Sequence, residues 1–455
     1  LWDGRSDEDF QERDQFEQTY EYNAAGELQG QTVPGGLRLA FDYNQRSLLS
    51  RVSGGFGTTA SSIFGGIEYD HRGATRKTDA KNGTRTCSWY DNRARLIGMM
   101  TGPETEVSCD DNPQDPNLAA FQQLTYDRTP TGLIKNVNDL SSVTPGIPSF
   151  SASYEYDRLY QLTKADTPEG VLTYGYDTIQ NLVYRQAEGS VGSAGAAGAD
   201  LFKNLPLGDF GYGENGAGPN QITSAGDQEL EYNAIGQMKS YNGFNLTFDV
   251  ESRLVEAKKP GQVTIEYHYD DTGEKKLTVI KRPNMPDKVY QYVSGGYQIR
   301  DGVETWFVSG GQGQVEITKA DGLDVTLQLL DEMLDYARDP STKKKPVPAE
   351  YMDLDGDGDL MDQEDLELAA AGYWNNVKVG GEQLVYRYYN KDHLGGSTVV
   401  TDSVGDVVST MRYHPYGQTA FRSGEKPVYG FAGGEIEEED ELGLVRFGAR
   451  WYAPG

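Results

Sequence analysis

Polar and apolar residues alternate along most of the chain, and tyrosines occupy one side of the alternation. Residues 153–156 (SYEY) and 265–269 (IEYHY) are typical stretches. Alternate side chains of a β-strand point to opposite faces, so one row of tyrosines packs while the intervening polar row meets solvent. The pattern therefore predicts a protein built mainly from β-strands.

One short unit recurs: an aromatic residue, then Asp or Asn, a polar stretch with Gly, and then Leu or a similar residue. Its copies begin at Tyr22, Tyr43, Tyr69, Tyr90, Tyr126, Tyr156, Tyr176, Tyr232, Phe248 and Tyr269. The Asp or Asn can bond to the backbone two residues on, and Gly supplies a positive φ, so the unit predicts a turn between two strands. Several copies start 20 or 21 residues apart, which is the length of one hairpin. Stacked hairpins form a long sheet in which each unit is buried only by its neighbours.

Composition and charge exclude several classes of protein. The 455 residues include 55 Gly and 30 Tyr, as long strands with many tight turns require. The net charge of −29 argues against binding to nucleic acid or to an anionic membrane, because both need basic patches. No apolar run approaches the ~18 residues of a membrane span. The chain begins at Leu1 rather than Met, and no signal peptide opens it.

The chain has two cysteines, Cys87 and Cys109, 22 residues apart. This spacing allows a disulfide but also fits two independent thiols, and the sequence leaves both readings open. No pair or Cys/His cluster with zinc-ligand spacing is present, so a structural zinc site is disfavoured.

Residues 353–364 (DLDGDGDLMDQE) match the calcium-loop pattern D-x-[DN]-x-[DN]-G-x₅-E. Hard oxygen ligands at alternate positions wrap one cation, the Gly at position 6 permits the sharp turn, and the last Glu can bind through both oxygens. Met361 at position 9 offers no side-chain oxygen, so we expect water there. The expected ligands of this calcium site are Asp353, Asp355, Asp357, Asp359 (through its carbonyl) and Glu364.

The flanks of this loop predict helices. Apolar residues from Leu327 to Ala337 lie at helical spacing before Pro340, and residues 364–371 (EDLELAAA) are expected to form the exit helix. A Lys/Pro linker at 341–348 separates the entering helix from the loop. We therefore expect a single structural calcium loop; the alternative is a solvated acidic loop.

The recurring unit resembles the YD repeat of the Rhs (rearrangement hotspot) family. Four longer stretches carry the resemblance: 154–163 (YEYDRLYQLT), 220–238 (NQITSAGDQELEYNAIGQM), 388–402 (YYNKDHLGGSTVVTD) and 431–454 (FAGGEIEEEDELGLVRFGARWYAP). The last two resemble the Rhs-associated core that closes the repeat region. The DHLG, TSAG and RLYQLT-like stretches are also similar to the C component of bacterial insecticidal toxin complexes.

The resemblance implies a mainly β fold: a spiral sheet of stacked hairpins that forms a hollow, cocoon-like shell around a toxic C-terminal segment. It divides the chain into a YD/Rhs-repeat shell (1–324), a helical insertion with the calcium loop (325–375) and the Rhs-associated core (376–455). In the family an intramolecular aspartyl autoprotease frees the toxin segment, but its motif would lie beyond Gly455. We rank Asp440 and Arg450 in the matched core as structural, and we expect no catalytic residue and no enzyme activity in this chain.

Other motifs carry less weight. Residues 211–216 (GYGENG) match the dinucleotide fingerprint, but Pro219 and the Gly-rich surroundings argue against the strand and helix that it needs. Asp392 and His393 could suggest acid–base chemistry, yet a turn-stabilising hydrogen bond is the better interpretation within the core motif.

Three hypotheses of function follow. The first is a bacterial Rhs-type shell, secreted or extracellular, that encapsulates its own C-terminal toxin segment, with toxin-complex or secretion-system proteins as delivery partners. The negative charge would help to hold a basic cargo or keep the particle soluble. The second is a cell-surface adhesion or carbohydrate-binding module, and the third is an enzyme such as a glycoside hydrolase, for which no site is recognisable.

Overall fold

The computed structural model describes residues 16–57, 60–141, 151–189, 205–294, 296–320, 336–337, 360–361, 383–437, 442–448 and 450–454. The chain divides into two compact units. The first comprises residues 1–302, 306–316 and 386–455, and the second comprises residues 303–305 and 317–385. Most of the described strands belong to the first unit.

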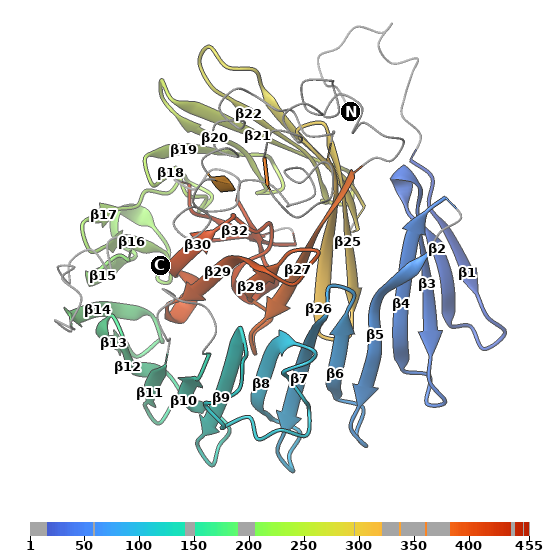
Figure 1. Ribbon diagram of the computed structural model, residues 1–455. Helices are drawn as coiled ribbons and strands as arrows, with labels where there is room; N and C mark the ends of the chain where they lie inside the picture. Colours follow the sequence, from blue (N-terminus) through green and yellow to red (C-terminus); the bar gives the residue numbers. More distant parts are fainter. Residues whose placement is uncertain are drawn as a thin grey trace, which may run out of the picture. The chain divides into compact units, whose positions relative to one another are not determined.

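The first sheet has 17 strands, and each pairs antiparallel with the next strand of the chain. Figure 1 shows these hairpins side by side in chain order. The strands are β1 (Thr19–Tyr22), β2 (Leu28–Thr32), β3 (Leu37–Tyr43), β4 (Leu49–Phe56), β5 (Ser61–Tyr69), β6 (Thr75–Ala80), β7 (Thr84–Tyr90), β8 (Leu96–Pro103), β9 (Gln122–Arg128), β10 (Ile134–Asp139), β11 (Ala152–Tyr156), β12 (Leu162–Thr167), β13 (Gly170–Tyr176), β14 (Leu182–Gly189), β15 (Gly208–Tyr212), β16 (Ile222–Ala225) and β17 (Gln228–Glu229).

A second sheet has 13 strands, and a third has three. The second contains β18 (Ser240–Tyr241), β19 (Phe244–Phe248), β20 (Leu254–Lys259), β21 (Val263–Tyr269), β22 (Lys275–Lys281), β23 (Lys288–Ser294), β24 (Tyr297–Arg300), β25 (Val303–Gly310), β26 (Gly313–Ala320), β27 (Gln383–Lys391), β28 (Ser397–Thr401), β29 (Val407–Tyr413) and β30 (Thr419–Gly424). The third contains β31 (Glu435–Ile436), β32 (Val445–Phe447) and β33 (Arg450–Tyr452). Short 3₁₀ turns are η1 (Pro34–Gly36), η2 (Glu214–Gly216), η4 (Pro415–Gly417) and η5 (Phe431–Gly433). The mainly β fold of long antiparallel sheets is thus confirmed.

The turn of the recurring unit is closed by bonds within five residues. Between β5 and β6, the Asp70 carboxylate accepts hydrogen bonds from the backbone N–H of Arg72 at 2.8 Å and of Ala74 at 3.0 Å. The N–H of Gly73 donates to the Asp70 carbonyl at 3.1 Å, and Gly73 has a φ of +93°. This is a tight hairpin loop with one residue in the left-handed region, which Gly adopts without steric cost.

The same pair of side-chain bonds recurs in most copies of the unit and confirms the predicted role of the Asp or Asn there. Its further copies are at Asn23, Asn44, Asp91, Asp157, Asp177, Asn233, Asp249, Asp270, Asp392 and Asp402. Asp392 and Asp402 belong to the C-terminal region, so this region uses the same turn as the repeats. The copy that begins at Tyr126 differs from the prediction: Asp127 lies within β9, and the turn is closed by Thr129, whose hydroxyl accepts from the N–H of Leu133 at 3.1 Å.

The tyrosine of the unit has a role beyond packing. In the hairpin of β3 and β4, the Tyr43 hydroxyl donates to the carbonyl of Leu28, the first residue of β2, at 2.9 Å. Each such bond ties the end of one hairpin to the start of the return strand in the hairpin before it. The same bond joins Tyr69 to Leu49, Tyr90 to Thr75, Tyr156 to Ile134, Tyr176 to Leu162, Tyr212 to Leu182, Tyr232 to Ile222, Tyr269 to Leu254 and Tyr413 to Ser397. We call this series of bonds the tyrosine ladder.

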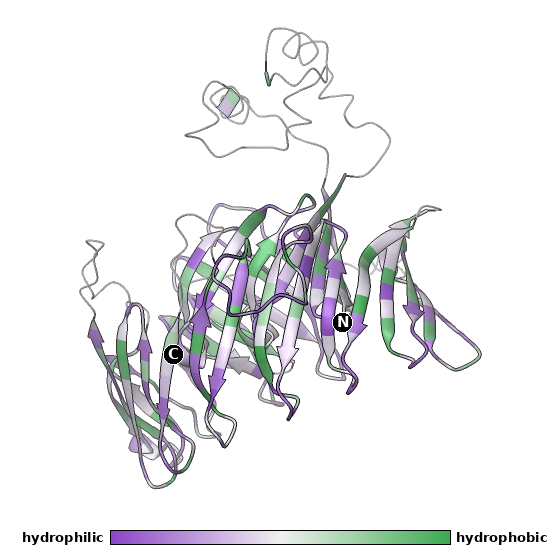
Figure 2. Cartoon of the chain, turned by 60° about the horizontal axis from the view of Figure 1, so that its bottom comes forward, coloured by the Kyte–Doolittle hydropathy of each residue, from purple (hydrophilic) through white to green (hydrophobic). Residues whose placement is uncertain are grey.

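Alternating residues of the strands build several local cores. Figure 2 shows hydrophilic and hydrophobic residues alternating along the strands. One such core lies on β19–β23 around Ile265, Tyr267 and Leu254, and Leu442 and Leu444 of the C-terminal segment pack into it. Repeats thus bury one another as expected, and the end of the chain completes the core.

The C-terminal strands also pack against strands far away in the sequence (Figure 1). The Asn82 amide donates to the Thr401 hydroxyl at 2.9 Å, and the Gln122 amide donates to the Thr398 hydroxyl. The indole N–H of Trp306, which is fully buried, donates to the Pro34 carbonyl at 2.8 Å. Polar bonds of this kind hold the C-terminal part of the first unit in one position.

Cys87 and Cys109 form a disulfide with their Cα atoms 5.2 Å apart. This settles the choice that the sequence left open. Cys87 lies in β7, whereas Cys109 lies in the long connection between β8 and β9, and both pack with Met100 and Ala120. The bridge therefore fastens this connection onto the sheet.

The structure also bears on three other predictions. Residues 211–216 form the end of β15 and the 3₁₀ turn η2, in keeping with the argument against a dinucleotide site. Of the helix expected before Pro340, only residues 336–337 are described, and they are helical. No helix among the described residues is long and apolar enough to cross a membrane.

Candidate functional site

A cavity of about 230 Å³ lies between the first sheet and the C-terminal strands, within the first unit. We call it the wall–core cavity. β9–β12 supply one side of its lining, and the turn after β27, the strands β28 and β29, and the segment up to η5 supply the other. Its lining residues are Leu124, Ile134, Val137, Tyr154, Tyr156, Leu162, Asp392, His393, Leu394, Thr398, Arg412, Tyr413, His414, Pro415, Tyr416 and Phe431.

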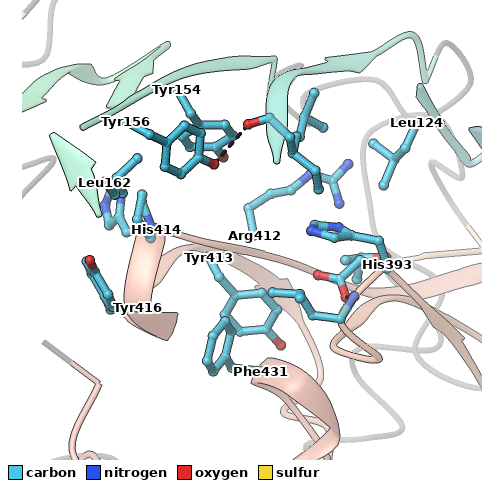
Figure 3. Close-up of a pocket in the computed structure, with 16 residues that line it drawn as sticks. Leu124, Tyr154, Tyr156, Leu162, His393, Arg412, Tyr413, His414, Tyr416 and Phe431 are labelled. Atoms are coloured by element: carbon cyan, nitrogen blue, oxygen red, sulfur yellow. Dashed lines mark hydrogen bonds between the residues drawn. The ribbon is translucent and has the colours of Figure 1, made fainter. Parts of the chain in front are cut away.

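Figure 3 shows the aromatic character of this cavity. Tyr154 and Tyr156 reach it from β11, and Tyr413, Tyr416 and Phe431 face them from the C-terminal side (Figure 3). The rings of Tyr413 and Phe431 lie edge to face, with their centroids 5.6 Å apart. Aromatic pairs in this arrangement contribute packing beyond the area they bury.

The Asp392 carboxylate is hydrogen-bonded to the backbone of its own turn. One carboxylate oxygen accepts from the backbone N–H groups of Leu394 at 2.9 Å and Gly396 at 2.8 Å. Burial raises the pKa of Asp392 to about 6, and the backbone hydrogen bonds only partly offset this rise. The prediction that this aspartate stabilises a turn is confirmed.

His393 packs against β9 of the first sheet. Its ring lies 4.8 Å from the ring of Tyr126, measured between centroids. Burial, followed by the nearby Arg128 cation, lowers the pKa of His393 to about 4, so the imidazole is neutral at physiological pH. The Asp392–His393 sequence therefore acts here through packing and turn geometry.

A buried ion pair joins the two sides beside the cavity. Arg412 Nη2 lies 3.1 Å from Asp139 Oδ2, and the exposed fractions of the two side chains are 6% and 0%. The other Asp139 oxygen accepts from the backbone N–H of Ser141 at 3.0 Å. This pair, which we call the Arg412–Asp139 clamp, connects β29 to the end of β10.

A second buried charge cluster fixes the three-stranded sheet. Glu435 lies 3.1 Å from the Lys275 ammonium and 3.1 Å from the Arg446 guanidinium. Burial alone would raise the pKa of Glu435, but the two cations outweigh burial and hold it below its ordinary value. The neighbouring Glu437 accepts from the Tyr267 hydroxyl at 2.8 Å. These bonds attach β31 and β32 to β21 and β22.

The predicted calcium site lies outside the described residues. This applies to Asp353, Asp355, Asp357, Asp359 and Glu364. Among the residues that the structure does describe, no group of three or more metal-ligating side chains comes together. Asp440 is also outside the described ranges, whereas Arg450 begins β33 and is exposed.

Sequence reasoning missed both buried charge clusters and the cavity. Asp139 and Arg412 are 273 residues apart, and neither lies in a motif that marks a buried charge. The tyrosine ladder did leave a signal, because the aromatic position of the unit is nearly always Tyr, whose hydroxyl needs a partner when it is half-buried.

Comparison with known proteins finds a similar architecture in solved structures of toxin complexes. No family model matches the chain. In a search of curated proteins, 84 residues are 34% identical to the toxin subunit YenC1 of Yersinia entomophaga, covering 17% of this chain and 8% of that protein.

Solved structures match over far more of the chain. All of it superposes on 21% of a chain in the crystal structure of TcdB2-TccC3-Cdc42, with a TM-score of 0.70 and 18% identity. A Tc holotoxin pore of Photorhabdus luminescens with a mutated TccC3 matches 96% of this chain and 19% of its own, with a TM-score of 0.67. At this identity the likeness is one of fold, and it confirms the resemblance to Rhs-repeat, toxin-complex proteins at that level. The chain spans about a fifth of the length of these solved chains.

Proposed function

We propose that this chain is part of the shell of a toxin-complex particle, and that the shell encloses a toxic segment until delivery. The observation that carries the proposal is the match of the whole chain to the TcdB2-TccC3 fold at a TM-score of 0.70. Its role is then mechanical, since a continuous wall keeps an enclosed polypeptide from folding or acting outside. The particle would work outside the producing cell.

The contacts of the buried polar groups among the described residues support a structural role. Asp392 is occupied by two backbone amides, His393 packs on Tyr126, and the buried charges pair with one another. Each group is used to hold one strand against another. We therefore propose that the chain contributes no catalysis of its own to the particle.

The test is protection of cargo in the natural full-length polypeptide. Intact particles are treated with proteinase K, and the segment after Gly455 is followed by mass spectrometry. An enclosed segment is cleaved only after the wall is opened, for example by the clamp variant Arg412→Met. Equal cleavage in intact and opened particles contradicts the proposal, and selective binding on a glycan array would favour an adhesion module instead.

We also propose that residues 353–364 bind one calcium ion that stabilises their own loop. Support comes from the sequence alone, through the acidic residues at positions 1, 3, 5 and 12 and the Gly at position 6. Calorimetric titration should show one site in the wild type and none in Asp353→Ala. Asp331→Ala, an acidic residue outside the loop, is the matched control. Absence of heat in the wild type contradicts the proposal.

A further inference from the structure

Arg185 is a buried cation that has no carboxylate beside it among the described residues. It lies in β14 and is 1% exposed. Nη1 donates to the Pro206 carbonyl at 3.2 Å, whereas Nε is buried without a hydrogen-bond partner. The two other buried Lys or Arg side chains that the structure describes, Lys275 and Arg412, each form an ion pair with a carboxylate. Since a buried charge without a counter-charge is costly, Arg185 is an exception that needs an explanation.

Aromatic rings flank the Arg185 guanidinium but do not balance its charge. Its Cζ atom lies 5.8 Å from the ring centroid of Tyr174 and 5.4 Å from that of Phe210. Such contacts attract a cation to the face of the ring, yet they do not accept its N–H groups as a carboxylate does. Burial lowers the pKa of Arg185, and the surrounding tyrosines only partly oppose this effect. The positive charge is therefore left without a negative partner.

A second buried donor stands opposite Arg185. Tyr174 of β13 is its register partner, and directly opposite residues of two paired strands lie on the same face of the sheet. Tyr174 is 2% exposed, and its hydroxyl is buried without a hydrogen-bond partner. Buried polar atoms are nearly always hydrogen-bonded, so an exception needs an explanation such as a bound water or ion. Two neighbouring exceptions on one face indicate one shared ligand that accepts from both.

The hydroxyls around Tyr174 already use their hydrogens. Tyr176 donates to the Leu162 carbonyl at 2.8 Å, so Tyr416 is the donor in its 2.6 Å bond to Tyr176. Tyr452 donates to the Tyr416 carbonyl at 2.6 Å. The ring of Tyr416 packs on that of Tyr174, with their centroids 5.7 Å apart, and Tyr416 is 38% exposed. The Tyr174 hydroxyl is therefore the donor left for a ligand, and the Tyr416 side reaches solvent.

We propose that Arg185 and Tyr174 bind one carboxylate group, which reaches them past Tyr416. A carboxylate brings one negative charge for one guanidinium, and its two oxygens can accept from Arg185 and from the Tyr174 hydroxyl together. A phosphate dianion would leave a charge and further oxygens unpaired in this buried place, so it fits less well. The carboxylate belongs either to a free small acid or to an acidic side chain of another polypeptide, and the experiment separates these sources. The inference goes beyond the proposed function and does not rest on it.

The first probe is acetate, titrated into the full chain at an ionic strength held constant with chloride. Binding is followed by amide hydrogen exchange of β13 and β14, which carry the two donors. Acetate should slow this exchange saturably, by about 10-fold at ten times its dissociation constant. Arg185→Met should abolish the slowing. Without acetate this variant should exchange no faster than the wild type, because it removes a charge that has no partner. Faster exchange there would show that the cation is already paired, and it overturns the proposal.

Tyr174→Phe is a second, milder variant. It removes one buried hydroxyl and should weaken acetate binding about 2- to 10-fold, the worth of one hydrogen bond. Tyr184→Phe is the matched control, because Tyr184 precedes Arg185 in β14 and so points to the opposite face of the sheet. Its acetate affinity should equal that of the wild type. An equal effect of the two Tyr→Phe changes contradicts the role given to Tyr174.

A further arm identifies the source of the carboxylate. A blocked peptide with one Glu, acetyl-Gly-Glu-Gly-amide, offers a side-chain carboxylate, and its Gln version is the control. Stronger protection by this peptide than by acetate assigns the site to a polypeptide side chain, and the reverse assigns it to a small acid. The proposal is overturned if neither probe slows exchange, or if phosphate or chloride acts as strongly as acetate. It is also overturned if acetate acts only in Asp200→Asn, since a carboxylate of the chain itself would then fill the site.

Discussion

Breaking the Arg412–Asp139 clamp should loosen the C-terminal strands from the first sheet. Arg412→Met keeps much of the side-chain volume but leaves the Asp139 carboxylate buried, with an exposed fraction of 0% for its side chain, and without its cation. Removing one partner of such a pair costs about 3–5 kcal/mol, because the remaining buried charge loses its counter-charge and water does not replace it. The expected loss is therefore a drop of that size in the free energy of local opening.

Hydrogen exchange of the backbone amides in β10 and β29 measures this opening directly. In a chain of this size the free energy of local opening is better defined than a single global free energy of unfolding. The double variant Arg412→Met with Asp139→Leu should recover most of the loss, since neither charge is then buried alone. The control is Lys239→Met, which breaks an exposed pair with Glu231 whose side chains are 53% and 71% exposed, and which should cost ~0–1 kcal/mol. A cost below ~1 kcal/mol for Arg412→Met, equal to that of the control, would refute the idea that this pair fastens the strands.

Three further predictions concern the repeats. Ala94 has a φ of +60° at the turn position that Gly73 holds in another hairpin. Ala94→Gly should therefore raise the stability of its hairpin by about 0.5–1 kcal/mol in thermal melts, and Gly73→Ala should lower the stability of the hairpin of β5 and β6. Reduction of the disulfide should destabilise the connection between β8 and β9 by about 3 kcal/mol, the chain-entropy value for a loop of 22 residues, and limited proteolysis should then cut this connection first. The Arg95 side chain, with backbone N–H groups, lowers the pKa of Asp91 to about 2, below the ~3.9 of an unfolded chain. Ionised Asp91 thus stabilises the fold above about pH 4 and this contribution is lost as the pH falls to 2, so Asp91→Asn should flatten the melting temperature over that window; an unchanged pH profile would contradict this assignment.

The local structure was predictable because its causes lie within a few residues. The Asp or Asn accepts hydrogen bonds from N–H groups two and four residues on, as Asp70 does from Arg72 and Ala74. Each strand then pairs with the next strand of the chain. These interactions need no distant partner, so the hairpins and the sheet could be derived from their repeating pattern. The calcium loop at 353–364 is equally legible in sequence, and it stays a prediction.

The candidate site was not predictable, because it depends on which distant strands meet. Nothing near Asp139 indicates that Arg412 will lie against it, and the wall–core cavity exists only where β9–β12 face the C-terminal strands. The spacing of Cys87 and Cys109 allowed a bridge, but only the packing of the connection onto β7 brought their Cα atoms to 5.2 Å.

The sequence by itself determined the turn, the hairpin and their repetition, since each is fixed by short-range hydrogen bonds and side-chain alternation. Only the tertiary structure decided which buried charges pair and where the C-terminal strands dock. A buried charge or hydroxyl must find a partner in space, and the chain can supply that partner from hundreds of residues away.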